Sequence, residues 1–157
     1  MKKYFVSKSR MDGTGVFAAR GIKRGEIILN IKGEPKHWIV KDKKSSEAGP
    51  NWIGLGKNLW LDVREPAVFL NHSCAPNAGI RGRVQLVALK DIKAGEEIHF
   101  DYSVTEEDKL WEMNCKCGTS LCRKKIKSIQ FLPKDVFRKY GQSIPRYFAS
   151  VYRKEVY

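Results

Sequence analysis

The sequence predicts a single, mainly β domain that ends in a short helical pair. Short β-rich segments alternate with glycine-containing turns over most of the chain, and the C-terminal part changes to a helical period. The 157 residues, 42% of them hydrophobic, suffice for one core, because a chain of this length buries roughly 70% of its unfolded surface. A second folded domain is not expected.

Six segments have the β-rich or alternating composition of strands: residues 4–6, 15–19, 26–31, 59–63, 84–89 and 97–100. Two turns, at 22–26 and 92–96, share the pattern Ile-Lys-x-Gly-Glu, which is too few copies for a repeat architecture. Residues 36–58 lack a clear period, and their run "KDKKSSEAGPN" predicts a mobile loop between Trp38 and Trp52.

The C-terminal part predicts two helices. Pro133 suits the first position of a helix that carries Val136, Phe137 and Tyr140 on one side, and Gly141 ends it. A second amphipathic face follows at helical spacing, formed by Ile144, Tyr147, Phe148, Val151 and Tyr152. We expect this pair to pack on the sheets.

A net charge of +13 favours acidic partners such as nucleic acid. The basic residues form small scattered groups without a nucleic-acid fold signature, so a solvated surface is the favoured interpretation. The apolar runs are too short for a membrane span, and "MKKYFVSKSRM" lacks the core of a signal peptide. We therefore expect a soluble cytoplasmic protein without membrane contact, nuclear or chromatin-associated if the source is eukaryotic.

All four cysteines fit one metal site. Cys115, Cys117 and Cys122 are spaced C-x-C-x4-C around Gly118, and Cys74 lies in "FLNHSCAPN". Four thiolates complete the tetrahedral shell of a structural zinc. The alternative, cysteines buried as small hydrophobes, is a poor fit to a polar, lysine-rich segment. A Cys74 nucleophile activated by His72 would need a third, orienting group, which the sequence does not supply.

The segment "GTGVFA" at 13–18 formally satisfies the dinucleotide-binding pattern G-x-G-x-x-G/A, but its context excludes that fold. No hydrophobic strand precedes it, and Gly21 and Gly25 would break a following helix. The two glycines still allow close backbone approach to a ligand, with an ordinary hairpin turn as the competing interpretation.

Taken in order, "GTGVFA", "FLNHSCAPN", "EEIHFDY" and "CKCGTSLC" resemble the SET-domain protein lysine methyltransferases with a post-SET cysteine tail. The resemblance covers residues from about 4 to 125, and the helical pair is similar to that of compact microbial members. It implies small β-sheets with a pseudoknot-like threaded segment. The implied organisation is a SET domain at 1–110, a post-SET zinc tail at 111–126 and a helical extension at 127–157, forming one compact unit.

The resemblance also implies a function: transfer of methyl groups from S-adenosylmethionine to a lysine of a protein, with Tyr102 as the catalytic residue. Asp101 would support the backbone beside it. Phe100 and Ile31 would line the substrate channel, and Phe100, in place of a tyrosine, implies more than one methyl transfer. One structural zinc would bind Cys74, Cys115, Cys117 and Cys122. The implied cofactor-binding residues are Gly13, Thr14, Gly15, Asn71, His72, Tyr102 and Trp111.

The chemistry follows from general principles as well. A lysine has a pKa near 10.4 and becomes a nucleophile only after losing its proton. A narrow aromatic channel beside a positive sulfonium lowers that pKa through desolvation and like charge, so no histidine base is essential. Because the transfer is an in-line displacement, positioning of the amine should supply most of the catalysis.

Two positions depart from the family pattern: Ile31 stands where a tyrosine is frequent, and Lys124 where glycine is common.

The competing function is a basic binding module for nucleic-acid-associated proteins with weak or no catalysis; a purely structural zinc protein would leave "GTG" and "FDY" unexplained. The expected partner is a histone-like, nucleoid or ribosomal protein that presents a lysine, with possible nonspecific nucleic-acid contact. The expected state is a monomer or weak homodimer.

Overall fold

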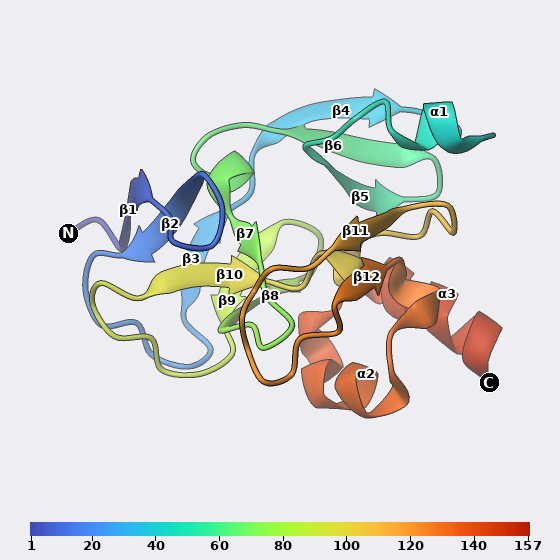
Figure 1. Cartoon of the computed structure of the whole chain (residues 1–157). Coiled ribbons are helices and arrows are strands. Elements are labelled where there is room, and N and C mark those ends of the chain that lie inside the picture. Colours follow the sequence, from blue (N-terminus) through green and yellow to red (C-terminus); the bar gives the residue numbers. More distant parts are fainter.

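The computed structural model describes all 157 residues as four small sheets and a helical C-terminal part (Figure 1). This confirms the mainly β prediction. The strands are β1 (Tyr4–Lys8), β2 (Thr14–Ala18), β3 (Ile27–Asn30), β4 (Gly33–His37), β5 (Trp52–Gly56), β6 (Leu59–Val63), β7 (Asn71–His72), β8 (Ala78–Arg81), β9 (Gln85–Ala88), β10 (Glu97–Phe100), β11 (Glu112–Asn114) and β12 (Lys125–Lys127). The α-helices are α1 (Lys43–Ser46), α2 (Lys134–Tyr140) and α3 (Arg146–Val156).

The central sheet has the order β1-β2-β10-β7 and joins segments that are distant in the sequence. β10 pairs antiparallel with β2 on one side and parallel with β7 on the other, where Phe100 lies opposite His72. The fully buried Val16 and Ile98 face each other in this register. The sheet therefore brings "NHSC" beside "FDY", as expected of the threaded fold.

Residues 36–58, which lack a clear period in the sequence, are largely structured, and a short helix lies within 41–51, where a mobile loop was expected. The segment contains the end of β4, then α1 and β5, and β4 and β5 flank β6 in one antiparallel sheet. Asp42 and Ser45 cap α1 reciprocally, and the Trp38 and Trp52 rings meet edge to face at 6.0 Å. Glycines hide the strand period of β5: a Cβ at Gly54 would lie 2.6 Å from the Thr105 carbonyl oxygen.

The C-terminal part packs on the sheets. α2 begins directly after Pro133, one residue later than predicted, and ends at Gly141, whose φ of 52° is in the left-handed region. The Phe137 ring of α2 stacks on Tyr152 of α3 at 3.8 Å. These side chains share a single core cluster with residues of the sheets, including Val16 and Leu86.

The helices are all short, and none has the length and apolar character required to cross a membrane.

Candidate functional site

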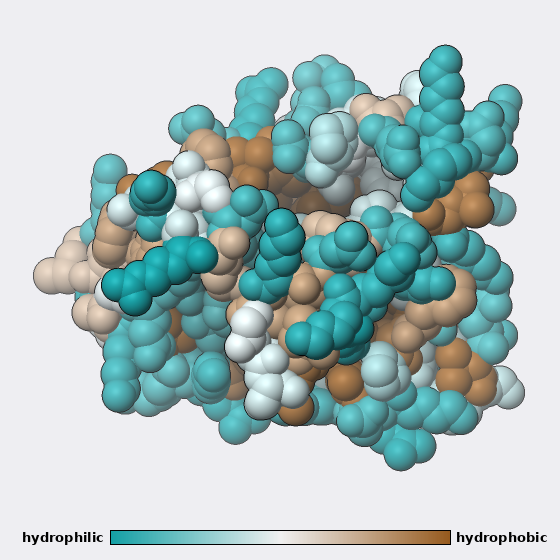
Figure 2. Space-filling view, in the orientation of Figure 1, coloured by the Kyte–Doolittle hydropathy of each residue, from teal (hydrophilic) through white to brown (hydrophobic).

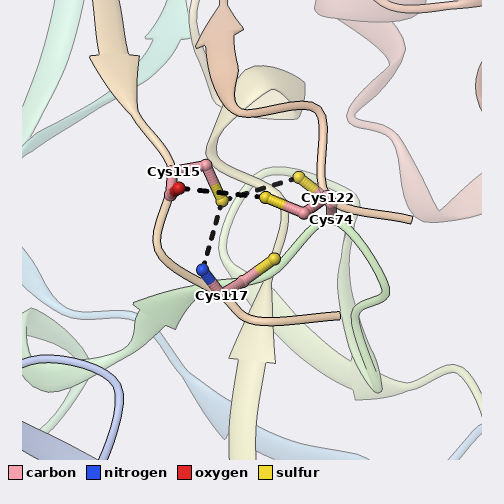
Figure 3. A group of neighbouring side chains, drawn as sticks. All are labelled: Cys74, Cys115, Cys117 and Cys122. Carbon is pink, nitrogen blue, oxygen red and sulfur yellow. Dashed lines mark hydrogen bonds between the residues drawn. The ribbon is translucent and has the colours of Figure 1, made fainter. Parts of the chain in front are cut away.

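The four cysteines come together from two distant segments (Figure 3). Cys74 follows β7, and the other three lie between β11 and β12, in a loop that turns at Gly118 with φ 70°. All four Sγ atoms lie within 4.8 Å of one another, and those of Cys74 and Cys115 are 3.7 Å apart. Four sulfurs at about 2.3 Å from a tetrahedral zinc are roughly 3.8 Å apart, so the cluster is compatible with a zinc ion.

Hydrogen-bond donors surround the cysteine cluster. The backbone N–H groups of Cys117, Arg123 and Lys124 point at the Sγ atoms of Cys115, Cys74 and Cys122, each at 3.4 Å. Such donors stabilise the thiolate form that metal ligation requires. The donor set therefore suits a metal better than a core of small hydrophobes.

His72 lies beside this cluster as a buried, neutral ring. Burial lowers the pKa of His72 to about 4. Its Nδ1 accepts the backbone N–H of Tyr102 at 3.1 Å, so Nε2 carries the proton and donates toward Cys74 Sγ at 3.3 Å. A ring that donates to Cys74 cannot remove its proton, which excludes the Cys74–His72 nucleophile.

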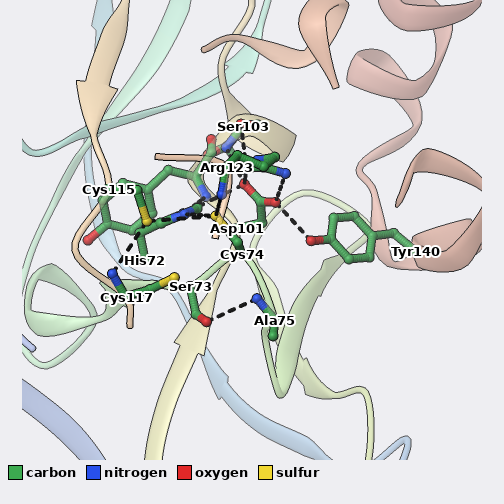
Figure 4. Close-up of polar contacts among 12 residues, drawn as sticks. His72, Ser73, Cys74, Ala75, Asp101, Ser103, Cys115, Cys117, Arg123 and Tyr140 are labelled. Carbon is green, nitrogen blue, oxygen red and sulfur yellow. Dashed lines mark hydrogen bonds and ion pairs between the residues drawn. The ribbon is translucent and has the colours of Figure 1, made fainter. Parts of the chain in front are cut away.

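Asp101 connects three parts of the molecule (Figure 4). It is 2% exposed and receives both guanidinium nitrogens of Arg123, at 2.7 and 2.8 Å, and the Tyr140 hydroxyl of α2 at 2.8 Å. Burial alone would raise the pKa of Asp101, but the Arg123 hydrogen bonds and charge hold it below its ordinary value. Because Arg123 follows Cys122, this pair fastens the cysteine loop and α2 to the residue before Tyr102. Asp101 also accepts the Ser103 N–H at 3.1 Å, consistent with its expected support of the backbone.

Tyr102 is oriented by contacts on several sides. Its hydroxyl donates to the Leu70 carbonyl at 2.6 Å, and its ring lies 5.1 Å from that of Phe100 and 5.3 Å from that of His72. Burial and the nearby Asp12 and Glu97 charges raise the pKa of Tyr102. The phenol thus stays protonated at neutral pH, with its proton directed at Leu70.

The glycine segment meets β7 and β10 through contacts made by Asn71. The Asn71 side-chain amide donates to the backbone carbonyls of Asp12 and Thr14, at 3.1 and 3.2 Å, and to the Glu97 carboxylate at 2.8 Å. A Cβ at Gly15 would collide with the end of the Glu97 side chain and displace the carboxylate from its bond with Asn71. This corner concentrates carbonyl and carboxylate oxygens, which suit a cationic group.

A pocket of about 330 Å³ opens between the β4-β6-β5 sheet and the segment around β11. Figure 2 shows hydrophobic atoms recessed at this junction, beneath the sheet that lies uppermost in the view. Four of the predicted site residues line it: Ile31, Phe100, Tyr102 and Trp111. The four tryptophans of the chain also converge here: Trp38, Trp52, Trp60 and Trp111.

The predicted residues thus fall into three neighbouring groups. Ile31 and Phe100, the residues predicted to form a substrate channel, line the pocket, while Gly13, Thr14, Gly15 and Asn71 form the oxygen-rich corner outside it. The cysteines form the third group, and Trp111 packs against their cluster while lining the pocket. Tyr102 adjoins all three.

Sequence reasoning missed several residues of this region. The sequence gives no reason to single out Arg123, and it places Trp38 and Trp52 only at the ends of a loop. Glu106 was not singled out, although it follows "FDY" closely, lines the pocket and is 8% exposed. A carboxylate so close to a candidate catalytic residue was the available signal.

Comparison with known proteins identifies the family. Residues 13–103 match the model of the SET domain. The chain is 31% identical over 134 residues to histone-lysine N-methyltransferase trithorax of Drosophila virilis, covering 76% of this chain but only 3% of that protein.

Solved structures show the same fold. Chaetomium thermophilum Polycomb Repressive Complex 2 bound to GSK126 is similar with a TM-score of 0.57 and 25% identity, covering 68% of this chain and 16% of that one. An autoinhibited ctPRC2 bound to S-adenosylmethionine has a TM-score of 0.55 and 23% identity over the same shares. Because the family model spans more than half of the 157 residues, the chain belongs to the SET domain family.

Proposed function

We propose that this chain is an S-adenosylmethionine-dependent protein-lysine N-methyltransferase with Tyr102 as its catalytic residue. The observation that carries the proposal is the setting of Tyr102: a protonated phenol, bonded to the Leu70 carbonyl at 2.6 Å, between an aromatic pocket and an oxygen-rich corner. The names of the relatives support it, since trithorax is a histone-lysine N-methyltransferase and a solved neighbour holds S-adenosylmethionine.

The oxygen-rich corner suits the methyl donor. Carbonyl oxygens of Asp12 and Thr14, with Glu97, offer acceptors to an α-ammonium group, and Asn71 holds these acceptors together. Gly13, with φ 45° and no atom near its missing side chain, leaves the donor space to approach the backbone. We assign Gly13, Thr14, Gly15, Asn71, His72, Tyr102 and Trp111 to donor binding. The His72 contribution comes from its backbone, because the ring is engaged internally.

The pocket suits the acceptor lysine. S-adenosylmethionine supplies a methyl group activated by a sulfonium. Burial among Ile31, Phe100 and Tyr102 disfavours the charged ammonium, so the lysine gives its proton to solvent and reacts as the free amine. The amine nitrogen then bonds the methyl carbon as the carbon–sulfur bond breaks. Because its O–H donates to the Leu70 carbonyl, the Tyr102 oxygen presents its lone pairs to orient both reactants.

The remaining assignments concern the tail and the product. Cys74, Cys115, Cys117 and Cys122 hold one structural zinc that ties the post-SET loop to β7. Phe100 leaves room for a methylated nitrogen to turn, so transfer proceeds beyond one methyl group. The substrate is a histone-like or other nucleic-acid-associated protein, reached in the nucleus if the source is eukaryotic. The catalytically weak binding module is not favoured, since it leaves the Tyr102 setting without a role.

The test is incubation of the purified chain with isotopically labelled S-adenosylmethionine and whole-cell extract, followed by mass spectrometry of labelled lysines. Tyr102→Phe should lower turnover by orders of magnitude and leave donor affinity, measured by calorimetry, within a few-fold, because the hydroxyl acts at the reacting atoms. Tyr157→Phe, which removes the hydroxyl of an exposed tyrosine in the same way, is the matched control and should keep its turnover. Donor binding without any labelled lysine would instead support the binding module.

A further inference from the structure

Glu106 is a buried residue in the wall of the pocket, and the proposed function gives it no role. It follows the short 3₁₀ helix of Tyr102–Thr105, so it lies near Tyr102 along the chain but on a different part of the pocket wall. Its backbone is held in place, because its carbonyl accepts the Ile129 N–H at 2.8 Å. The Glu106 backbone therefore has a defined position beside the pocket.

One oxygen of this carboxyl has no side-chain partner. Oε1 accepts the Asp108 N–H at 2.8 Å, and no side-chain hydrogen bond or ion pair within the protein involves Oε2. The side-chain atoms that are both sealed and unpartnered belong to Ser128, Gln130 and Tyr152. Oε2 is not among them, so it keeps some accessible surface, and Glu106 belongs to the wall of the pocket.

The surroundings of Glu106 favour a cation from outside the protein. Burial raises the pKa of Glu106 to about 8, with the adjacent Asp108 and Glu107 charges adding to the shift. A cationic partner would offset the cost of ionising this buried carboxyl. Tryptophan faces attract cations as well. Lys43, the basic residue of the pocket wall, is engaged elsewhere, with its Nζ on the Leu110 carbonyl at 3.1 Å.

The cation that Glu106 would bind is not the substrate lysine that accepts the methyl group. A carboxylate holding that ammonium would raise its pKa and oppose transfer, because the amine must first lose its proton. The pocket also extends well beyond Ile31, Phe100 and Tyr102, reaching Trp38 and Trp52 below α1. A hydrogen bond from Ser46 to Asp108 holds α1 against the Glu106 segment, so that α1 forms one wall of this part of the pocket.

We infer that Glu106 is a specificity-determining residue that binds a second basic side chain, arginine or lysine, close to the methylated lysine of the substrate. This inference rests on the proposed function, because it assumes a polypeptide lying across the pocket. The net charge of +13 repels basic polypeptides at long range, so a carboxylate at short range selects where such a substrate binds. Its charge-assisted hydrogen bond should improve binding of the matching peptide by roughly tenfold or more.

The experiment uses synthetic peptides with one central lysine in a glycine–serine background. A single arginine is placed at each flanking position in turn, with glutamine and glutamate at the same positions as controls. Binding is measured by fluorescence anisotropy of labelled peptides, and methyl transfer by mass spectrometry with S-adenosylmethionine. We expect arginine to improve binding and kcat/KM at one or two positions, and glutamate to weaken both there.

Variants test whether Glu106 is the source of the preference for arginine peptides. Glu106→Gln should abolish the difference between arginine and glutamine peptides while keeping the rate on the glutamine peptide, and Glu106→Asp should retain part of it. Glu112→Gln is the matched control, since Glu112 also lines the pocket but already pairs with Lys125 at 2.9 Å; it should keep the full preference. Circular dichroism confirms that each variant is folded.

The inference is overturned if the unaltered protein binds arginine and glutamine peptides equally at every position. It is also overturned if Glu106→Gln keeps the arginine preference, or lowers activity on all peptides by the same factor. If the unaltered protein transfers no methyl group at all, the proposed function fails, and the anisotropy series still decides whether Glu106 selects a basic side chain.

Discussion

Lys124 has a backbone conformation that few side chains adopt. Its φ is 65°, in the left-handed region, and its N–H is directed at Cys122 Sγ at 3.4 Å. This is the position where the sequence departs from the glycine that is common in post-SET tails. The Lys124 backbone is therefore strained where the cysteine loop turns, at a cost on the order of 1–2 kcal/mol.

Replacing Lys124 by glycine should raise the free energy of unfolding by up to about 1 kcal/mol, because relief of the strain exceeds the added entropy of the unfolded chain. Lys125→Gly, at the neighbouring exposed position in β12, is the control and should lower stability. Thermal unfolding of the zinc-loaded protein measures both. Equal losses from the two substitutions would show that Lys124 is not strained.

Glu106 makes stability depend on pH. Burial raises its pKa to about 8 in the folded protein, above the ordinary value of 4.5 in the unfolded chain. Between these values the folded protein holds more protons than the unfolded one, so stability from this group is full below about pH 4.5 and is lost as pH rises through about 8.

Glu106→Gln removes this dependence, because an amide does not titrate in this range. The substitution should therefore raise the unfolding temperature at about pH 8.5 and change it much less at about pH 5. Calorimetric scans of both proteins at the two pH values give the comparison. A difference between the proteins that does not vary with pH would mean that Glu106 is not held protonated.

Some elements could be predicted from the sequence and others could not. β2, β6 and β10 were predicted because each carries apolar residues that alternate or cluster between glycine turns. β5 was not predicted because Gly54 and Gly56 interrupt the alternation of apolar and polar residues. Its place is set by the close contact of Gly54 with Thr105 and Phe148, far along the chain. β7 has only two residues and owes its strand to β10. Tertiary contacts, not local preference, form these elements.

The same distinction applies to the site. The cysteines could be grouped from the sequence because metal ligation demands a fixed number of thiolates. Tyr102, Asn71 and the glycines followed from the family resemblance. For Glu106 the sequence offers one signal, its closeness to "FDY". Its burial, and the pairing of Arg123 with Asp101, come from contacts across the chain and could not be predicted.

The β11–β12 loop depends on its cysteines more than on a core. Only Cys74, Cys115 and Ile126 are buried in its cluster, so removing zinc should release the loop from β7. Treatment with a strong chelator, or Cys117→Ser, should lower the unfolding temperature and weaken donor binding together, because Trp111 enters the pocket from this segment. Elemental analysis of protein purified without chelator should give one zinc per chain, and its absence would contradict the assignment.

At the scale of the whole molecule, the ranges 1–110, 111–126 and 127–157 are proposed to form one unit. Arg123 and Tyr140 both bond Asp101, so the tail and α2 meet at the residue that precedes Tyr102. Phe148 and Tyr152 of α3 are at most 1% exposed and belong to the core cluster that contains Val16 and Leu86. The helical extension is therefore part of the core and not an appendage.

Deleting residues 127–157 should abolish cooperative folding of the remainder. Each buried aromatic side chain removed costs about 3–5 kcal/mol, and several such losses exceed the roughly 5–15 kcal/mol that stabilise a domain of this size. Calorimetry of the full chain should show a single transition, and the truncated chain should show none. Removing only Tyr157, which is 72% exposed, is the control and should leave the transition in place. A truncated chain that still unfolds cooperatively and binds S-adenosylmethionine would mean that the extension is a separable addition, and that Asp101 is held by Arg123 without help from Tyr140.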